Sequence, residues 1–146
     1  MIDEDGLDFF NSLSGRLRIK LTEPAQPASP QLLNLVAPKD ARVVSVELVL
    51  SVFENDDARP LTEEEWSRVV LRAPTIKMAS LDTTDVVVET PSPNGEVFTV
   101  RDLKDAIART EQMSRDRGEW MGGVDVHHVY FEGIECEDDV WMIAWG

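Results

Sequence analysis

The chain has 146 residues, and its 28 Asp and Glu outnumber its 14 Lys and Arg to give a formal net charge of −14. This length suits one domain, residues 1–146, which is large enough to fold around a hydrophobic core without a disulfide or a metal. The negative charge argues against direct binding to nucleic acid and to anionic membrane surfaces, because both would repel the chain.

Cysteine usage and the first residues predict the compartment. Cys136 is the one cysteine, so no internal disulfide can form, which is typical of a reducing compartment. The first ten residues are acidic and lack the basic and apolar runs of a secretory signal. No apolar run approaches the roughly 18 residues of a membrane span. We therefore expect a soluble, cytoplasmic protein.

The first thirty residues predict three different segments. Residues 1–13 space apolar side chains among acids, which predicts either a short amphipathic helix or a mobile terminus. Arg16, Arg18 and Lys20 then alternate with apolar residues and predict a half-buried strand, whose outward cations are expected to neutralise acidic neighbours. Residues 22–30 contain three prolines and predict an extended connector within the domain.

Residues 41–54 carry the strongest strand pattern in the chain. Alternate positions from Val44 to Val52 are all apolar, so this face is expected to point into the core. The next signal is a capping-box sequence of Thr62 and Glu65, which predicts a short helix that ends near Arg72.

The following residues predict two strands, 75–79 and 85–89, joined by a turn. Asn94-Gly95 predicts a second turn with positive φ. Residues 99–115 predict the longest helix, with an apolar face and with Glu111 and Arg115 among the charged residues on the other faces.

The last part of the chain predicts a C-terminal β-hairpin, with strands at 124–134 and 140–145 around an acidic loop at 135–139. Strands thus come in runs and do not alternate strictly with helices. This order favours an α+β fold, in which an antiparallel sheet carries two helices packed on one face.

Motifs for catalysis or cofactor binding are missing from the sequence. The adjacent His127 and His128 would point to opposite faces of a strand, so one metal could not bind both. No further histidine completes a zinc site, and the acidic loop lacks the spacing of a calcium loop. The acids around Cys136 disfavour its thiolate. We therefore expect no catalytic residue, no cofactor and no metal.

Residues 118–146 combine seven acids, no Lys or Arg, and three of the four tryptophans. Acids without nearby cations create a negative field, and large aromatic side chains within such a field are typical anchors of a binding surface. Trp141 and Trp145 share a strand face with Ile143 and are expected in the core, which leaves Trp120 as the exposed aromatic. The predicted binding residues are Glu119, Trp120, Asp125, His127, Glu132, Glu135, Glu137, Asp138 and Asp139.

These features predict a small, acidic, non-catalytic interaction protein that docks a basic protein partner, as an inhibitor or immunity-type protein would. The sequence also allows two alternatives. One is a small hydrolase-like or metal-dependent enzyme that uses His127 with Asp125 or Glu132. The other is a structural subunit of a larger assembly, which would expose a wide apolar patch.

Overall fold

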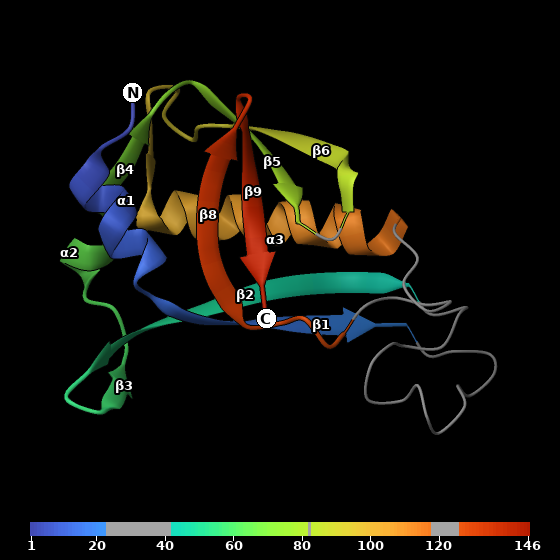
Figure 1. The fold of residues 1–146 in the computed structure, drawn as a ribbon, viewed down its shortest axis with the longest axis horizontal. Coiled ribbons are helices and arrows are strands. Elements are labelled where there is room, and N and C mark those ends of the chain that lie inside the picture. Colours follow the sequence, from blue (N-terminus) through green and yellow to red (C-terminus); the bar gives the residue numbers. More distant parts are fainter. Residues whose placement is uncertain (23–41, 82, 118–125) are drawn as a thin grey trace.

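A computed structural model describes residues 1–22, 42–81, 83–117 and 126–146, and these form a mixed α+β fold (Figure 1). The Pro-rich segment from residue 23 onward, Gly118, Glu119, Trp120 and Asp125 lie outside the described residues. The elements are α1 (Glu4–Asn11), β1 (Ser14–Leu21), β2 (Val43–Glu54), β3 (Asp57–Arg59), α2 (Glu63–Trp66), β4 (Val69–Arg72), β5 (Thr75–Ser80), β6 (Thr83–Pro91), β7 (Val97–Thr99), α3 (Val100–Arg117), β8 (Phe131–Glu137) and β9 (Val140–Trp145).

The described strands form three sheets rather than the one that the sequence predicts. Their orders are β1-β2-β3, β4-β7 and β6-β5-β9-β8. All neighbours run antiparallel except β5 and β9, which are parallel. The long helix α3 packs against β2, β5 and β6, and in Figure 1 it runs behind the four-stranded sheet. The helix α1 contacts β4 and β8, while α2, the other helix of the predicted pair, contacts α3.

The core lies between α3 and the two larger sheets, as the helical spacing predicts. Leu103 and Ile107 of α3 are fully buried, together with Met78 of β5 and Ile143 of β9. The helix begins with a reciprocal cap: the Asp102 N–H donates to Thr99 Oγ1 at 3.2 Å, and the Thr99 N–H donates to Asp102 Oδ2 at 3.0 Å. Apolar periodicity and capping sequence together therefore fix where α3 starts and which face it buries.

The helix predicted to end near Arg72 is only one turn long. The capping box of Thr62 and Glu65 is present, but α2 ends at Trp66 and β4 follows from Val69. The β-branched Val69 and Val70 favour a strand, and β4 gains a partner in β7, which the sequence did not predict. The part of the predicted helix beyond Trp66 is therefore wrong. Trp66 instead lies beneath cations of α3.

The two N-terminal strand predictions are confirmed with small changes. In β1, Leu17 is buried, whereas Arg16, Arg18 and Lys20 are exposed. In β2 the predicted apolar face does point inward, except that Val44 near the strand start is 46% exposed. The segment at residues 1–13 forms the helix alternative, since Asp3 caps α1 by accepting a hydrogen bond from the Gly6 N–H at 2.9 Å.

The C-terminal hairpin has different bounds from the predicted ones. β8 starts at Phe131 rather than at residue 124, and it continues through Glu137, so the predicted acidic loop is mostly strand. Asp138 and Asp139 alone make the turn, with φ values of 51° and 67°. Positive φ at both central residues is the backbone of a tight two-residue hairpin turn. None of the helices in the described ranges is both long and apolar enough to cross a membrane.

Candidate docking surface

The four-stranded sheet has one face against α3 and an outer face away from it. On β9, Trp141, Ile143 and Trp145 point inward and are buried, which confirms that the two tryptophans belong to the core. Met142 and Ala144 alternate with them and therefore point outward. The register places Met142 opposite Glu135 and Ala144 opposite Gly133, so these four residues share the outer face.

A groove of about 540 Å³ crosses this outer face from α1 to the end of β5. Its floor is low because the two smallest side chains of the face, Gly133 and Ala144, lie opposite each other. We call it the outer groove. Its lining residues are Ile2, Leu7, Asn11, Leu81, Glu132, Gly133, Ile134, Glu135, Cys136, Trp141, Met142 and Ala144.

A β-bulge in β8 shapes the bottom of the outer groove. The register between β8 and β9 shifts between Phe131 and Gly133, which leaves Glu132 as the extra residue. Gly133 has a φ of 111°, a backbone conformation that side chains with a Cβ rarely adopt. A Cβ at this position would also lie 3.2 Å from Asn11 Oδ1. Glycine at 133 therefore keeps both the bulge and the depth of the groove.

The wall on the α1 side is joined to β8 by one side chain. Asn11 Nδ2 donates to the Ile134 carbonyl at 3.1 Å, and the Ile134 N–H donates to Asn11 Oδ1 at 2.9 Å. The amide thus imitates a neighbouring strand at the open edge of β8. Leu7, one helical turn earlier, lies in the lining of the groove.

The carboxylates of the hairpin lie around this groove and beyond it. Glu132 and Glu135 are part of the lining, and Glu137, Asp138 and Asp139 follow at the end of the hairpin, which we call the acidic tip. All five residues are exposed. Within the described ranges of the chain, no Lys or Arg forms an ion pair with any of them.

The acids of α1 add to the same negative field. Glu4, Asp5 and Asp8 are exposed on a helix that contacts β8, and they too form no ion pair with described residues. Unpaired charges next to low-dielectric protein produce a potential that extends into the solvent. The outer groove is therefore apolar at its floor and negative at its margins.

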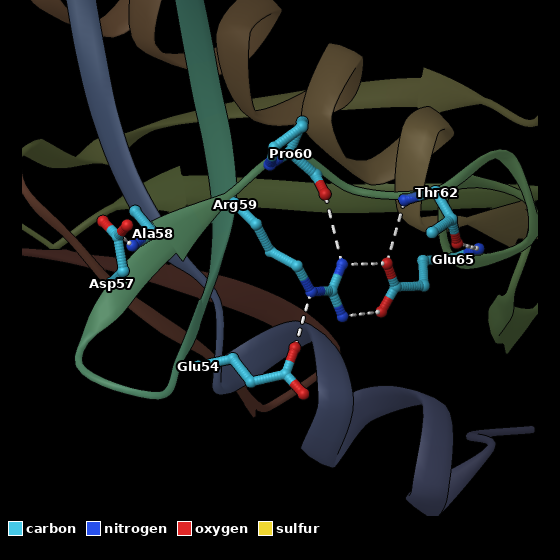
Figure 2. A network of polar contacts seen from close by, with 7 residues as sticks. All are labelled: Glu54, Asp57, Ala58, Arg59, Pro60, Thr62 and Glu65. Carbon is cyan, nitrogen blue, oxygen red and sulfur yellow. Dashed lines mark hydrogen bonds and ion pairs between the residues drawn. The ribbon is translucent and has the colours of Figure 1, made fainter.

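Other parts of the chain do pair their charges. Figure 2 shows Arg59 between two acids: its Nε donates to Glu54 at 2.7 Å, and its terminal nitrogens donate to both oxygens of Glu65 at 2.8 and 3.0 Å. These bonds from Arg59, with that from the Thr62 N–H, lower the pKa of Glu65 to about 2. The network holds β3 against α2, and both of its carboxylates are paired with Arg59.

Glu111 and Arg115 form a buried ion pair, although the sequence analysis placed both residues outside the apolar face of the helix. Glu111 is fully buried and Arg115 is 6% exposed. Glu111 Oε1 accepts from Arg115 Nε at 2.9 Å and from Ser80 Oγ at 3.2 Å, while the Arg115 guanidinium also donates to the His128 carbonyl. Burial raises the pKa of the Glu111 carboxyl above its usual range, against the opposing effect of Arg115. The spacing from Ile107 to Glu111 could have placed this acid on the buried stripe.

The histidines do not occupy the geometry that the sequence predicts. Residues 126–129 are not strand, and the rings of His127 and His128 contact each other edge to face, with their centres 5.3 Å apart. The prediction that they point to opposite faces is therefore wrong. Among the residues that the structure describes, no three His, Cys, Asp or Glu lie where they could hold a metal.

The predicted binding residues thus divide into four groups. Glu132 and Glu135 line the outer groove, and Glu137, Asp138 and Asp139 form the acidic tip. His127 lies in the segment before β8. The remaining three predicted residues, at 119, 120 and 125, fall outside the described residues. Sequence reasoning missed Leu7, Asn11, Leu81, Gly133, Met142 and Ala144, which give the groove its walls and floor.

Comparison with known proteins gives no assignment. The chain matches no protein family, no curated protein and no solved structure.

Proposed function

We propose that this protein docks a basic protein partner through the outer groove and the acidic tip. The observation that carries the proposal is the juxtaposition of an apolar groove with carboxylates that have no cation partner in the described parts of the chain. A protein that blocks a cationic enzyme, as inhibitors and immunity-type proteins do, would use such a surface.

The groove would contribute favourable binding free energy through the burial of apolar surface. Leu81 is 54% exposed at one end, and Met142 and Leu7 are half-buried, so a partner side chain placed there would remove apolar surface from water. Each square ångström removed contributes roughly 25 cal/mol. The arrangement of an apolar centre with a charged margin matches the general anatomy of protein interfaces. The groove supplies this centre without requiring Trp120, the anchor that the sequence predicted.

The unpaired acids support the rate and selectivity of docking. A cationic partner is attracted over a distance of about one Debye length, roughly 8 Å at physiological salt, before contact is made. Rim charges act mainly on the association rate, which can exceed that of a neutral pair by several orders of magnitude at low salt. The net charge of −14 acts in the same direction.

The test begins with affinity capture from the source cell and continues with the purified pair. In the double variant Glu132→Gln/Glu135→Gln, we expect the association rate to fall about tenfold at low salt. The matched control is Glu64→Gln/Glu96→Gln, which removes two exposed acids elsewhere and should change the rate less than twofold.

Cys136 gives a second readout, because it is exposed, lies in the groove lining and is the one thiol of the chain. A bound basic partner should slow alkylation of this thiol by at least tenfold. Equal association rates for the groove and control variants, or an alkylation rate unchanged by the partner, would refute the proposal.

A further inference from the structure

The outer face of β1 and β2 carries a different set of exposed groups. The register places Arg16 opposite Val49, Arg18 opposite Glu47, and Lys20 opposite Ser45. Arg16, Arg18 and Lys20 are all exposed, while Leu17 between them points into the core. Three cations therefore follow one another along one strand at intervals of roughly 6.6 Å, twice the rise per residue.

These cations are not used to neutralise acids of the fold, contrary to the sequence-based expectation. In the described parts of the chain, the ion pairs involve Arg59, Arg101, Lys104 and Arg115, and none involves a residue of β1. The guanidinium of Arg16 lies 6.0 Å from the ring centre of Tyr130 instead. Among the residues that the structure describes, this stripe therefore has no carboxylate partner, although the chain has twice as many acids as bases.

Large apolar side chains are exposed beside the stripe. Val49 is 38% exposed, Phe53 is 62% exposed and Tyr130 is 58% exposed. A hollow of about 290 Å³ lies between residues 16–19 of β1 and the segment that contains Val126 and Val129. We call the group of Arg16, Arg18, Lys20, Val49, Phe53 and Tyr130 the cationic face. Cations interleaved with exposed aromatic rings are typical of binding surfaces rather than of a merely solvated strand.

We propose that the cationic face binds an extended acidic segment of a protein partner. In an extended segment, carboxylates at alternate positions repeat at the same roughly 6.6 Å interval as the cations of β1. A guanidinium matches a carboxylate with two parallel hydrogen bonds. Apolar residues at further alternate positions of the same segment point to the same side as its carboxylates. They would cover Val49, opposite Arg16, and Phe53, which lies further along β2 opposite Ala58.

This surface lies far from the acidic tip, although Glu132 of the outer groove is only two residues from Tyr130. Tyr130, just before β8, bridges to Arg16, whereas Asp138 lies at the far end of the hairpin. At about 3.3 Å per residue, the eight steps from Tyr130 to Asp138 span roughly 26 Å. Figure 1 shows the hairpin turn and β1 at opposite ends of β8. The proposal therefore does not depend on the function proposed above.

A short acidic segment fits this face better than a nucleic acid. A polyphosphate carries charge over its whole length, and the net charge of −14 would repel the part that extends beyond three cations. Glu47 lies within the face, opposite Arg18, and repels a phosphate and a carboxylate alike. A short segment with only a few carboxylates avoids the first cost, the repulsion of the part that extends beyond the three cations.

The experiment measures binding of a fluorescent peptide by anisotropy at low salt. In this peptide four Glu at alternate positions are followed, at the next two alternate positions, by Val and Phe, so that all six side chains point to one side. We expect Arg16→Gln/Arg18→Gln to weaken binding about fivefold to tenfold, as expected for the loss of two exposed charge-assisted contacts. The matched control, Arg72→Gln/Lys77→Gln, removes the same charge from exposed cations on other strands and should change the affinity less than twofold. Circular dichroism and thermal unfolding verify that each variant folds.

Two further probes separate the competing explanations. The same peptide with Gln in place of Glu should bind at least tenfold more weakly. A single-stranded oligonucleotide of equal charge should bind more weakly than the acidic peptide. The proposal is overturned if the acidic peptide does not bind, if both double variants weaken binding equally, or if the oligonucleotide binds more tightly.

Discussion

Asn11 and Ile134 lie 123 residues apart in the sequence, yet they exchange two hydrogen bonds, of 2.9 and 3.1 Å. The pair ties α1 to the exposed edge of β8, next to the bulge at Gly133. An edge strand offers unpaired N–H and C=O groups to any passing chain, and here one side-chain amide satisfies both groups of Ile134. The same amide borders the outer groove. The Asn11 side chain therefore both forms part of the groove wall and covers the edge of β8.

Removing this amide should loosen α1 locally. We expect Asn11→Ala to lower the free energy of unfolding by about 1 kcal/mol, the usual net value of lost hydrogen bonds at a partly buried site. Hydrogen exchange should become faster at the Ile134 amide. Asp8→Ala, an exposed change on the same helix, should stay within roughly 0.5 kcal/mol of the parent. Unchanged exchange at Ile134 in Asn11→Ala would show that the edge is held by other contacts.

The two glycines with positive φ should respond differently to alanine. Gly95 has a φ of 79° and open space around a new Cβ, so Gly95→Ala should cost only the backbone strain, about 1 kcal/mol. Gly133→Ala adds the contact with Asn11 and should cost about 2 kcal/mol, since the bulge or the amide must shift. Denaturant unfolding of both variants measures the difference. Equal losses of unfolding free energy in the two variants would mean that Asn11 and α1 move away from the new Cβ without cost.

The buried pair of Glu111 and Arg115 should behave as a unit. Arg115→Met leaves a buried carboxylate without its cation, and we expect a loss of about 3 kcal/mol. The double variant Glu111→Leu/Arg115→Met should recover most of that loss, because well-packed apolar groups avoid the desolvation of both charges. Chemical denaturation of the single and double variants gives the coupling energy. Additive losses would contradict the pairing.

Glu111 and Glu65 should affect the pH dependence of stability with opposite signs. The pKa of Glu111 is raised in the folded state, so its favourable contribution is full below pH 4.5 and is lost as pH rises through the folded pKa. Glu111→Gln should therefore gain stability relative to the parent between pH 4 and pH 8.

The pKa of Glu65 is lowered to about 2, so its contribution is present above pH 4.5 and is lost as pH falls toward 2. Glu65→Gln should be less stable than the parent at pH 7, by about 1 kcal/mol because Arg59 is partly exposed, and should approach it near pH 2. If the unfolding free energies of parent and variant change in parallel with pH, the pKa shift of the substituted residue is excluded. Urea unfolding between pH 2 and pH 8 covers both cases.

The turn residues of the acidic tip offer a test that separates folding from docking. Asp138→Asn/Asp139→Gly suits the positive φ values at both positions and should raise stability by roughly 0.5–1 kcal/mol. The same change removes two unpaired charges, so association with a basic partner should slow and become less salt-dependent. A variant that is more stable but associates at the parent rate would locate the docking charges elsewhere.

The spacing of apolar residues correctly predicted the elements that have one apolar face and one polar face. The buried stripe of α3 and the alternation in β1 and β2 follow directly from the order of apolar residues, and the structure confirms them. The helix that starts at Glu63 was predicted to be too long, because a capping box marks where a helix starts but not how many turns follow. Val69 then found a strand partner in β7, which only the tertiary fold could supply.

The outer groove could not be predicted in the same way. It depends on the register that places Gly133 opposite Ala144 and on a helix from the other end of the chain. The acids around it were predicted from composition, because seven acids without Lys or Arg stand out in the last 29 residues of the sequence. The burial of Glu111 was not predicted because the residue was assigned to the exposed faces by its charge. Its position one helical turn after the buried Ile107 points to the core instead.

The parallel pairing of β5 with β9 has a consequence for biosynthesis. Met78 pairs with Trp141, about 60 residues later, so β5 and β6 leave the ribosome well before their neighbour exists. Until then one edge of β5 stays open, and the nascent chain depends on α3 to shield its apolar side. The centre of this sheet is therefore completed only after β9 has been synthesised.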